Sequence, residues 1–550
     1  MHLADHTIAT VPEGNRSLLA LLFSTLAFRL FCIFWYRTDY DEPQHLHVVW
    51  GWARGLVQYR DVFDNHPPLF HLLSIPLLRW SPESADILLR GRFFVLPLAL
   101  VSLLLTWLIA KRAFNQRVGL VSAILLGVTP PFVLKTVEFR NDVLWCALLL
   151  VSVLVLISGC FTVARSMTAG LILGFALTSS LKTAILIIAL VLAAVTFWFR
   201  DRGATGRNSG NERMALFAGG LTCAVAPLLT ALLFGWLGAF DDLVYGAWGF
   251  NSLFRVSNVR RIGGLIALPL LAGVTLAVTR RRLRAAGEPT TIPTFLGVTS
   301  IYYIIVLLCL WPIITTRDFL PVLPIGVILV SAQFTRGINN RSSRMAPALA
   351  GLVLAGMTWT IFYGDLWRPP TDYSYRIIED VLRLTRLGEV VMDLKGETVF
   401  RPRATRYIFE HVGRELVKRG ILEDKVVSDI IAKRCCVAVR DHHGFSTNAR
   451  RFMNENFISV GSVRVCGKQI ASLKRGEDAT FSIAVPGRYA MTGRGEIRGN
   501  LDGTSYTGPR WLDVGKHRFT AQSTTRDLYV VWAQAVERGM LPERRLPLGP

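Results

Sequence analysis

Eleven stretches of mostly apolar residues are distributed over the first two thirds of this 550-residue chain. A helix needs about 20 mostly apolar residues to cross a bilayer. Hydrophobic residues make up 51% of the sequence and charged residues only 18%, which is too little polar surface for a water-soluble protein of this length. The chain is therefore predicted to be a polytopic α-helical membrane protein. The predicted spans are 17–36, 92–110, 118–134, 143–159, 168–181, 183–199, 214–235, 263–279, 293–311, 320–335 and 346–363.

Short basic loops predict the orientation of these spans. If residues 168–181 and 183–199 form two separate spans, four such loops lie on the same side of the membrane. The alternative is that these two stretches form one long helix. The loops are 111–117, 200–213, 279–288 and 335–344. By the positive-inside rule this side is the cytoplasm. Twelve of the fifteen carboxylates between residues 17 and 363 then lie on the outer face, which is where chemistry is expected.

The composition changes to that of a soluble domain from about residue 364. Residues 364–475 are predicted to form an extracytoplasmic α/β unit, and residues 476–550 a β-sandwich-like unit with short alternating strands. The first unit should contain an amphipathic helix over 403–420, with Ile408, Val412 and Leu416 on one face. Residues 1–363 form the membrane domain, with outer loops at 37–91 and 135–142.

Three of the eight cysteines lie in this predicted extracytoplasmic part. Adjacent cysteines rarely pair with each other. A disulfide from Cys435 or Cys436 to Cys466 is therefore one prediction, and three free thiols are the alternative. No spacing of cysteines and histidines resembles a zinc site.

The stretch after the first span, YRTDYDEPQHLHVVWGWARGLVQYRDVFDNHPPLFHLL, is unusually rich in titratable residues. It holds four histidines and five carboxylates, Asp39, Asp41, Glu42, Asp61 and Asp64. Residues 43–57 have helical periodicity, and Trp50 and Trp52 suit the lipid headgroup level, so a helix lying along the membrane surface is predicted. Helix capping alone is an alternative explanation for Asp41.

The segment DYDEPQHLH…GLVQYRDVFDNHPPLF resembles the first outer loop of GT-C glycosyltransferases, in the protein-O-mannosyltransferase-like family that includes lipopolysaccharide-modifying enzymes. Members show an acidic pair after the first span and then G…PYRD.F..H.PL; Gln58 stands where the family has proline. Three later segments, EFRND (138–142), GLILGFALTSSLKTAILI (170–187) and RDFLPVLP (317–324), are similar to further family segments. The resemblance covers about residues 15–335 and implies a GT-C-like fold.

The resemblance implies that one sugar moves from a polyprenyl-phosphate carrier to an acceptor hydroxyl, with inversion at the anomeric carbon. Asp41 matches the loop aspartate of the family and is the predicted base, with Glu42 and Asp142 as the other catalytic candidates. The growing charge on the phosphate requires fixed cations.

Three basic residues are the candidates for that phosphate cradle: Lys182, Arg317 and Arg140. Lys182 is predicted inside a span, where charge is usually functional. Alternatively, Arg317 is an interfacial arginine that reaches toward the headgroups. Arg140 could instead be an ordinary ion-pair partner of Glu138 or Asp142.

Five more residues are expected near the acceptor or a metal ion: Asp39, His45, Asp64, His66 and Glu138. A divalent metal ion is a candidate cofactor, although no ligand spacing identifies the ion. The alternative is that His66 forms hydrogen bonds within a loop whose backbone is fixed by prolines.

The expected partners are the lipid-linked sugar donor, a glycolipid, polysaccharide or protein acceptor, and membrane lipids. Nucleic acid is not expected, because the basic residues flank helices and form no tract interleaved with aromatics. The expected location is a bacterial-type inner membrane with the C-terminal part outside. A polytopic transporter of a lipid or glycan is the alternative function; against it, the carboxylates lie on the outer face rather than at the bilayer midplane.

Overall fold

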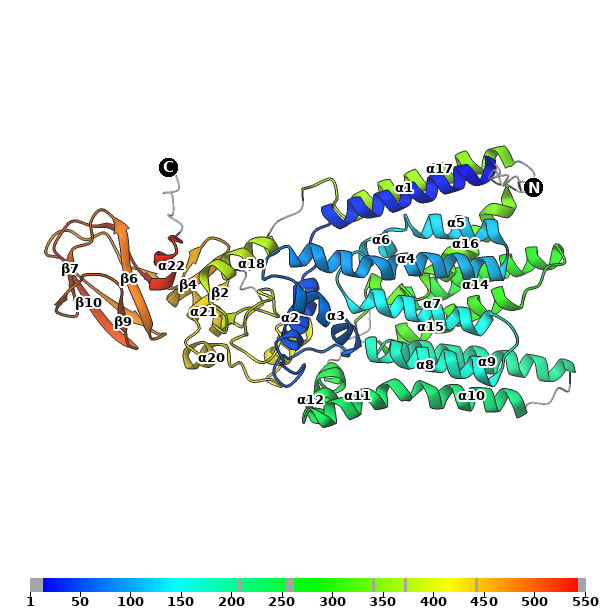
Figure 1. Cartoon of the computed structure of the whole chain (residues 1–550), viewed down its shortest axis with the longest axis horizontal. Helices are drawn as coiled ribbons and strands as arrows, with labels where there is room; N and C mark the ends of the chain where they lie inside the picture. The colour runs from blue at the N-terminus through cyan, green and yellow to red at the C-terminus, as the bar shows by residue number, and fades with distance from the viewer. Residues whose placement is uncertain are drawn as a thin grey trace, which may run out of the picture.

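The computed structural model describes residues 13–205, 210–253, 262–311, 313–338, 342–369, 373–440 and 444–542. A bundle of long helices forms one end of the molecule, and the C-terminal units form the other (Figure 1). The bundle consists of α1 (Glu13–Trp35), α4 (Ile87–Ala113), α5 (Gln116–Leu126), α6 (Pro130–Lys135), α7 (Asn141–Ile157), α8 (Val163–Ser179), α9 (Thr183–Thr205), α10 (Gly210–Cys223), α11 (Val225–Trp236), α14 (Ile262–Ala285), α15 (Thr291–Leu310), α16 (Leu323–Gly337) and α17 (Ser342–Tyr363).

Every predicted span corresponds to a helix or a pair of helices in this bundle. The predicted break before α9 is present, because α8 ends at Ser179 and α9 begins at Thr183. The predicted span 118–134 is interrupted, since Pro130 and Pro131 begin the separate helix α6 and lack the N–H groups that would continue α5. The predicted loops 200–213 and 335–344 and the outer segment 236–262 include residues outside the described part of the chain.

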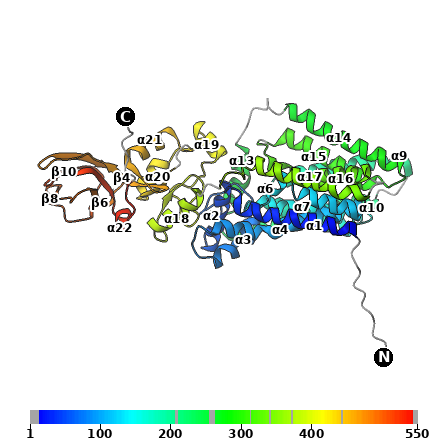
Figure 2. The same ribbon diagram turned by 90° about the horizontal axis from the view of Figure 1, so that it is seen from above.

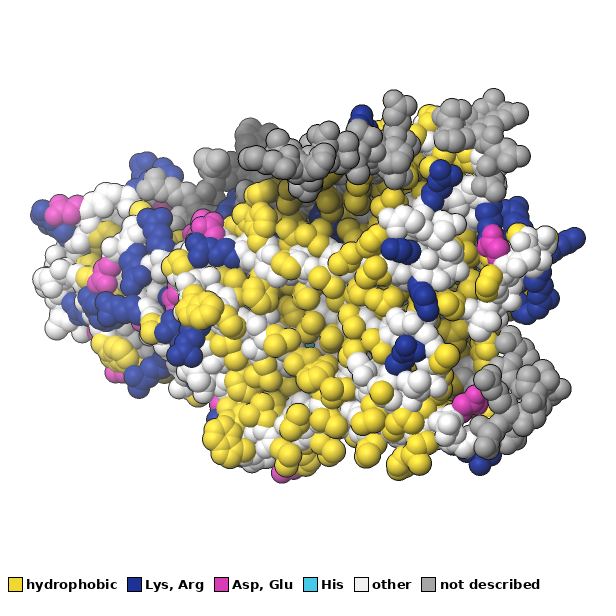
Figure 3. Space-filling model, turned by 45° about the vertical axis from the view of Figure 1, so that its right-hand side comes forward, with side chains coloured by type: hydrophobic (Ala, Val, Ile, Leu, Met, Phe, Trp, Pro, Cys, Tyr) yellow, Lys and Arg dark blue, Asp and Glu magenta, His cyan; other side chains and the backbone are white. Residues whose placement is uncertain are grey.

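Five helices of the described residues are long and apolar enough to cross a membrane, at 16–35, 87–113, 210–236, 291–310 and 345–363. Several other bundle helices are apolar but shorter, so the number of eleven crossings stays a prediction. On the face shown in Figure 3, hydrophobic side chains cover a broad middle region, and Lys and Arg side chains gather at both ends. This surface is that of an integral membrane protein.

The first outer loop contains two helices, α2 (Asp41–Ala53) and α3 (Leu69–Trp80). Both views place α2 between the bundle and the C-terminal units (Figure 1, Figure 2). The predicted helix is present as α2, and its position along the membrane surface stays a prediction. Trp50 does not face lipid headgroups, however, because it is only 5% exposed, and His47 Nδ1 hydrogen-bonds Val399 O at 2.8 Å. The C-terminal part covers this helix. Local periodicity could not reveal a contact with such a distant segment.

The C-terminal part contains helices α18 (Tyr373–Leu384), α19 (His411–Lys418), α20 (Val426–Ala432), α21 (Thr447–Asn456) and α22 (Ala533–Glu537). Its strands are β1 (Val391–Met392), β2 (Val437–Val439), β3 (Phe457–Val460), β4 (Val463–Gln469), β5 (Asp478–Ile483), β6 (Gly487–Arg494), β7 (Gly499–Leu501), β8 (Thr504–Ser505), β9 (Arg510–Leu512), β10 (Gly515–Ala521) and β11 (Arg526–Trp532). One sheet has the order β1-β2-β4-β11-β6-β9, with β3 also on β4, and the other has the order β5-β10-β7-β8.

The predicted helix over 403–420 is shorter than expected. Only α19 forms, while the chain before it is irregular because the Arg403 guanidinium bonds the Asp393 carboxylate at 2.6 Å and nearby carbonyl oxygens. Ile408, Val412 and Leu416 are nevertheless buried together. The prediction that these three residues face the same side is therefore confirmed, although the part of the segment before α19 is not helical.

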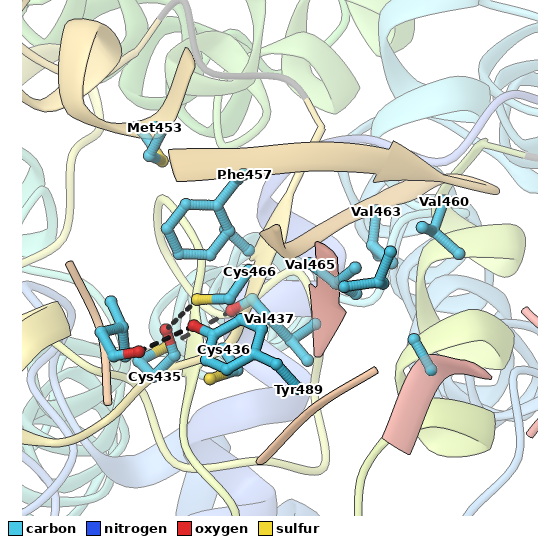
Figure 4. Close-up of a cluster of buried hydrophobic side chains, with 14 of the residues drawn as sticks. Cys435, Cys436, Val437, Met453, Phe457, Val460, Val463, Val465, Cys466 and Tyr489 are labelled. Carbon is cyan, nitrogen blue, oxygen red and sulfur yellow. Dashed lines mark hydrogen bonds between the residues drawn. The ribbon is translucent and has the colours of Figure 1, made fainter. Parts of the chain in front are cut away.

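The three C-terminal cysteines lie in the core between β2, β4 and β6 (Figure 4). All three are free thiols, so the predicted disulfide to Cys466 is wrong and the alternative is correct. Cys466 Sγ contacts the carbonyl oxygen of Cys435 at 3.7 Å, and Cys435 Sγ contacts that of Val437 at 3.3 Å. The thiols of Cys435 and Cys466 therefore contact backbone carbonyl oxygens.

Candidate active site

Charged side chains from distant parts of the sequence converge where α2 begins. They come from the start of α2, the loop between α6 and α7, the junction between α8 and α9, the 3-10 helix η3 (Thr316–Phe319) and the C-terminal part. We call this set the ion-pair network; its members are Asp39, Asp41, Glu138, Asp142, Asp318, Lys135, Arg140, Lys182, Arg317 and Lys395.

The turn before α2 fixes Asp39 and Asp41. Asp39 Oδ1 accepts from the backbone N–H of Asp41 at 3.1 Å, and Glu42 Oε1 accepts from the N–H of Asp39 at 2.9 Å. The N-cap residue of α2, Tyr40, makes no side-chain cap bond, and the Asp41 carboxylate binds cations instead. Capping therefore does not account for the side chain of Asp41.

Both carboxylate oxygens of Asp41 bind cations. Arg140 Nη1 bonds one oxygen and Lys395 Nζ bonds the other, and Arg317 Nη1 lies 3.6 Å away. The Asp41 side chain retains 20% of its exposure, whereas Asp142 and Glu138 are buried. Asp41 is thus a reachable carboxylate held within a strongly cationic surrounding.

Arg317 lies inside the network, where its guanidinium pairs with carboxylates. Its Nη2 atom is 2.6 Å from Asp39, and its Nε atom is 3.2 Å from Glu138. Burial opposes charge on Asp39, but Arg140 and Arg317 outweigh it and lower the pKa of Asp39. Burial, with the nearby Asp39, raises the pKa of Glu138 to about 7 against the lowering effect of Arg317 and Lys135.

Asp142 holds two cations in place. Its carboxylate is 3.1 Å from Arg140 Nε and 3.4 Å from Lys182 Nζ. Lys182 also pairs with Asp318 at 2.6 Å, and Asp318 is itself fixed by the backbone N–H of Thr315 at 2.6 Å. Arg140 therefore has the predicted ion-pair partner, and it also belongs to the cationic group beside Asp41.

Glu42 points away from the network cations. Its carboxylate accepts two bonds from Arg92, at 3.0 and 2.7 Å, and one from the backbone N–H of Phe139 at 3.1 Å. Arg92 also bonds three backbone carbonyls at the end of α1, including Tyr36 O at 2.6 Å. The pair ties the first outer loop to α4 and to the loop before α7, which is a positioning role.

The remaining predicted residues form a second cluster with hydrogen bonds of its own. Asp64 accepts from Gln44 at 2.7 Å and pairs with His66 at 3.1 Å, while His45 bonds His71 at 2.8 Å. Although burial opposes charge on Asp64, His66 outweighs it and holds the pKa of Asp64 well below its usual range. Burial lowers the pKa of His71 to about 4. The cluster thus combines a carboxylate, Asp64, whose charged form is favoured with an imidazole, His71, whose neutral form is favoured.

The residues expected for a metal ion do not form a ligand set. Within the described ranges, no three His, Cys, Asp or Glu side chains are arranged to hold a metal ion. The buried Nε2 atom of His45 has no hydrogen-bond partner there, but Asp64 is already bonded to Gln44 and His66. The described residues therefore offer no ligand set for the candidate divalent ion.

Sequence reasoning missed four residues around the network: Lys135, Asp318, Arg92 and Lys395. Lys135 and Asp318 lie inside two segments that were singled out, the loop 135–142 and the segment 317–324, so their position was a usable signal. Lys395 lies 354 residues from Asp41 in the sequence, and no local pattern marks it.

Comparisons with known proteins agree with this architecture. Residues 88–207 match the family described as dolichyl-phosphate-mannose-protein mannosyltransferase. No match is found among curated proteins. The fold is similar to the crystal structure of ArnT from Cupriavidus metallidurans bound to undecaprenyl phosphate, with a TM-score of 0.58 and 13% identity over 82% of this chain and 97% of that one. For the apo state of that protein the TM-score is 0.56 at 12% identity, over 82% of this chain and 98% of that one. The family match over residues 88–207 and the similarity to the ArnT fold agree with the GT-C-like fold expected from the sequence.

Proposed function

We propose that the protein transfers one sugar from a polyprenyl-phosphate carrier to an acceptor hydroxyl on the outer face of the membrane, with inversion and with Asp41 as the base. The observation that carries this proposal is the position of Asp41, a partly exposed carboxylate in direct contact with Arg140 and beside Arg317. An acceptor hydroxyl needs a carboxylate, and a departing phosphate needs cations. Both are present at the start of α2.

In this reaction the acceptor oxygen attacks the anomeric carbon while its proton passes to an Asp41 oxygen. The bond between the anomeric carbon and the phosphate oxygen breaks, and its electron pair stays on the phosphate. A single displacement of this kind inverts the anomeric carbon. Arg140, Arg317 and Lys182 are the proposed cations that stabilise the second negative charge as it develops on the phosphate.

The carrier is proposed from the family match and from the undecaprenyl phosphate in the similar ArnT structure. The proposed location is a bacterial-type inner membrane with residues 364–550 outside, supported by the basic loops of the predicted inner side. A glycolipid, a polysaccharide or a protein could each supply the acceptor hydroxyl. Mass spectrometry of the envelope with and without the gene should reveal one glycan that lacks a single sugar unit, and an unchanged glycan profile would contradict the proposal.

Asp41→Asn tests the base directly. The amide keeps the size of the side chain but cannot take up the proton at useful pH, so we expect a loss of about 10²–10⁴-fold in transfer rate. Binding of the carrier lipid should be largely retained, because Arg140 and Arg317 remain.

Asp61→Asn is the matched control. Asp61 lies in the same outer loop, but it is exposed and pairs with Arg60 at 2.9 Å outside the network. This variant should transfer at close to the normal rate. Normal transfer by Asp41→Asn would exclude Asp41 as the base and make Asp39 or Asp142 the next candidate.

Arg317→Ala tests the phosphate cradle separately. Loss of a charge-assisted contact worth about 1.5–3 kcal/mol should slow turnover by about one to two orders of magnitude. If Arg317→Ala and Lys182→Ala both keep full activity with purified carrier lipid, the phosphate binds elsewhere.

A further inference from the structure

The C-terminal part reaches the active site through one irregular segment, residues 393–406, which we call the strap. Asp393 fixes the shape of the strap, because its carboxylate accepts from the backbone N–H groups of Gly396 at 3.0 Å and Thr398 at 3.2 Å. The Arg403 guanidinium binds the same carboxylate at 2.6 Å. The position of the intervening Lys395 is therefore set by a hydrogen-bonded turn.

The strap is docked along α2 at close range. Gly396 has a φ of +104°, and a Cβ atom at this position would lie 2.7 Å from the Cβ of His47. Three residues further on, Val399 O bonds His47 Nδ1 at 2.8 Å. Beyond it, Arg401 pairs with Glu83 of the first outer loop at 2.8 Å. These contacts place Lys395 at the start of α2, beside the network.

Lys395 forms an ion pair with Asp41, the residue that the proposed reaction requires as its base. Its ammonium bonds one oxygen of Asp41 while Arg140 bonds the other, and only 11% of the Lys395 side chain is exposed. A carboxylate whose two oxygens both bind cations is a weak proton acceptor, because the cations stabilise its charged form. Lys395 must therefore release Asp41 before the acceptor proton can be taken up.

The donor itself can provide that release. The network holds five carboxylates and five cations, so its formal charge is balanced while no phosphate is bound. The donor phosphate adds one negative charge, and departure of the lipid phosphate adds another. An ammonium with three N–H donors on a flexible stem can exchange a carboxylate for a phosphate over a short distance. Burial lowers the pKa of Lys395, which adds to the need for an anionic partner.

We propose that Lys395 is a phosphate-binding residue supplied by the C-terminal part: it binds Asp41 while the donor site is empty and moves to the donor phosphate when the carrier binds, which frees Asp41 to act as base. The inference rests on the proposed function and deepens it. Carrier binding and activation of the base are then one event, so Asp41 becomes basic only when a donor is present.

The test measures two properties of the purified full-length protein: its affinity for undecaprenyl phosphate and the pH profile of sugar transfer. Lys395→Met should weaken binding of undecaprenyl phosphate by about tenfold to a hundredfold, as expected for one charge-assisted contact. It should also move the acid limb of the kcat/KM profile to higher pH, because the Asp41 carboxylate loses a cation that stabilises its charged form. Lys395→Arg should keep most of the affinity.

Lys425→Met is the matched control, because Lys425 is a 59% exposed lysine of the C-terminal part that pairs with Glu423 at the surface. It should bind and transfer normally. Gly396→Ala is a second variant that keeps the lysine but pushes the strap away from His47, and it should weaken binding in the same direction. A folded Lys395→Met protein with unchanged affinity for undecaprenyl phosphate would overturn the inference.

The two proposals can fail separately. If the wild-type protein binds undecaprenyl phosphate but changes no envelope glycan, the transferase proposal fails, whatever Lys395→Met does to binding. If the wild type transfers sugar and Lys395→Met binds and transfers equally well, only the role of Lys395 is wrong. A merely structural role of Lys395 would lower thermal stability without moving the acid limb, and this outcome also counts against the inference.

Discussion

Glu42→Gln should destabilise the protein rather than abolish its chemistry. The carboxylate of Glu42 is buried, and it accepts two bonds from Arg92 and one each from the backbone N–H groups of Phe139 and Asp39. Removing one partner of a buried ion pair costs about 3–5 kcal/mol, because the other charge stays buried without compensation. Arg92 keeps its three carbonyl partners in α1 and the chain after it, so we expect a loss near the lower end, about 3 kcal/mol.

Thermal unfolding of the purified protein in lipid-containing detergent measures this loss, with transfer activity per folded molecule as the second readout. The double variant Glu42→Gln with Arg92→Met should lose less than the sum of the single variants, because no charge is left unpaired. Glu415→Gln is the control, since Glu415 forms an exposed pair with Arg419 and should unfold like the wild type. A Glu42→Gln protein with normal stability and no transfer would refute this reasoning and make Glu42 part of the chemistry.

Two further predictions concern Glu138 and the topology. Folding raises the pKa of Glu138 from 4.5 to about 7. The contribution of Glu138 to the stability of the folded protein is therefore complete below pH 4.5, and it is lost as the pH rises through about 7. Thermal stability should therefore fall between about pH 5 and about pH 8, and it should fall less in Glu138→Gln; equal slopes would contradict this. A membrane-impermeant maleimide should label an introduced Ser428→Cys in intact cells but not the natural Cys160 on the predicted inner side. Labelling of Cys160 alone would reverse the orientation.

The helical bundle could be predicted from the sequence because a bilayer imposes one simple requirement, a run of apolar residues long enough to cross it. The break at Lys182 was visible for the same reason, since a charge interrupts such a run. The carboxylates and cations of the first two outer loops were also found, from their density and from the family resemblance. Asp39, Asp41, Arg140 and Arg317 do converge.

The parts that depend on docking between distant segments could not be predicted. Trp50 is covered by the C-terminal part, and its apolar character alone cannot distinguish protein from lipid as its neighbour. Lys395 has no local signal, because its function in the network depends on how a turn held by Asp393 approaches α2. The different partners of the neighbours Asp41 and Glu42 could not be predicted either. Successive residues of a helix point in different directions, and the sequence does not show that Arg92 lies on the side of Glu42.

Strand β4 belongs to both C-terminal units. Its first residues pair with β2 and β3, and its last residues, from Gly467 to Gln469, pair with β11. A chain cut at residue 475 would keep β4 but expose the N–H and C=O groups that β11 satisfies, and such an edge recruits strands from other copies. Inactivity of that truncated protein would report aggregation, not a lost glycan contact. The four-stranded sheet β5-β10-β7-β8 does not include β4. Surface substitutions in that sheet can therefore probe the β-rich unit while the strands on either side of β4 stay paired.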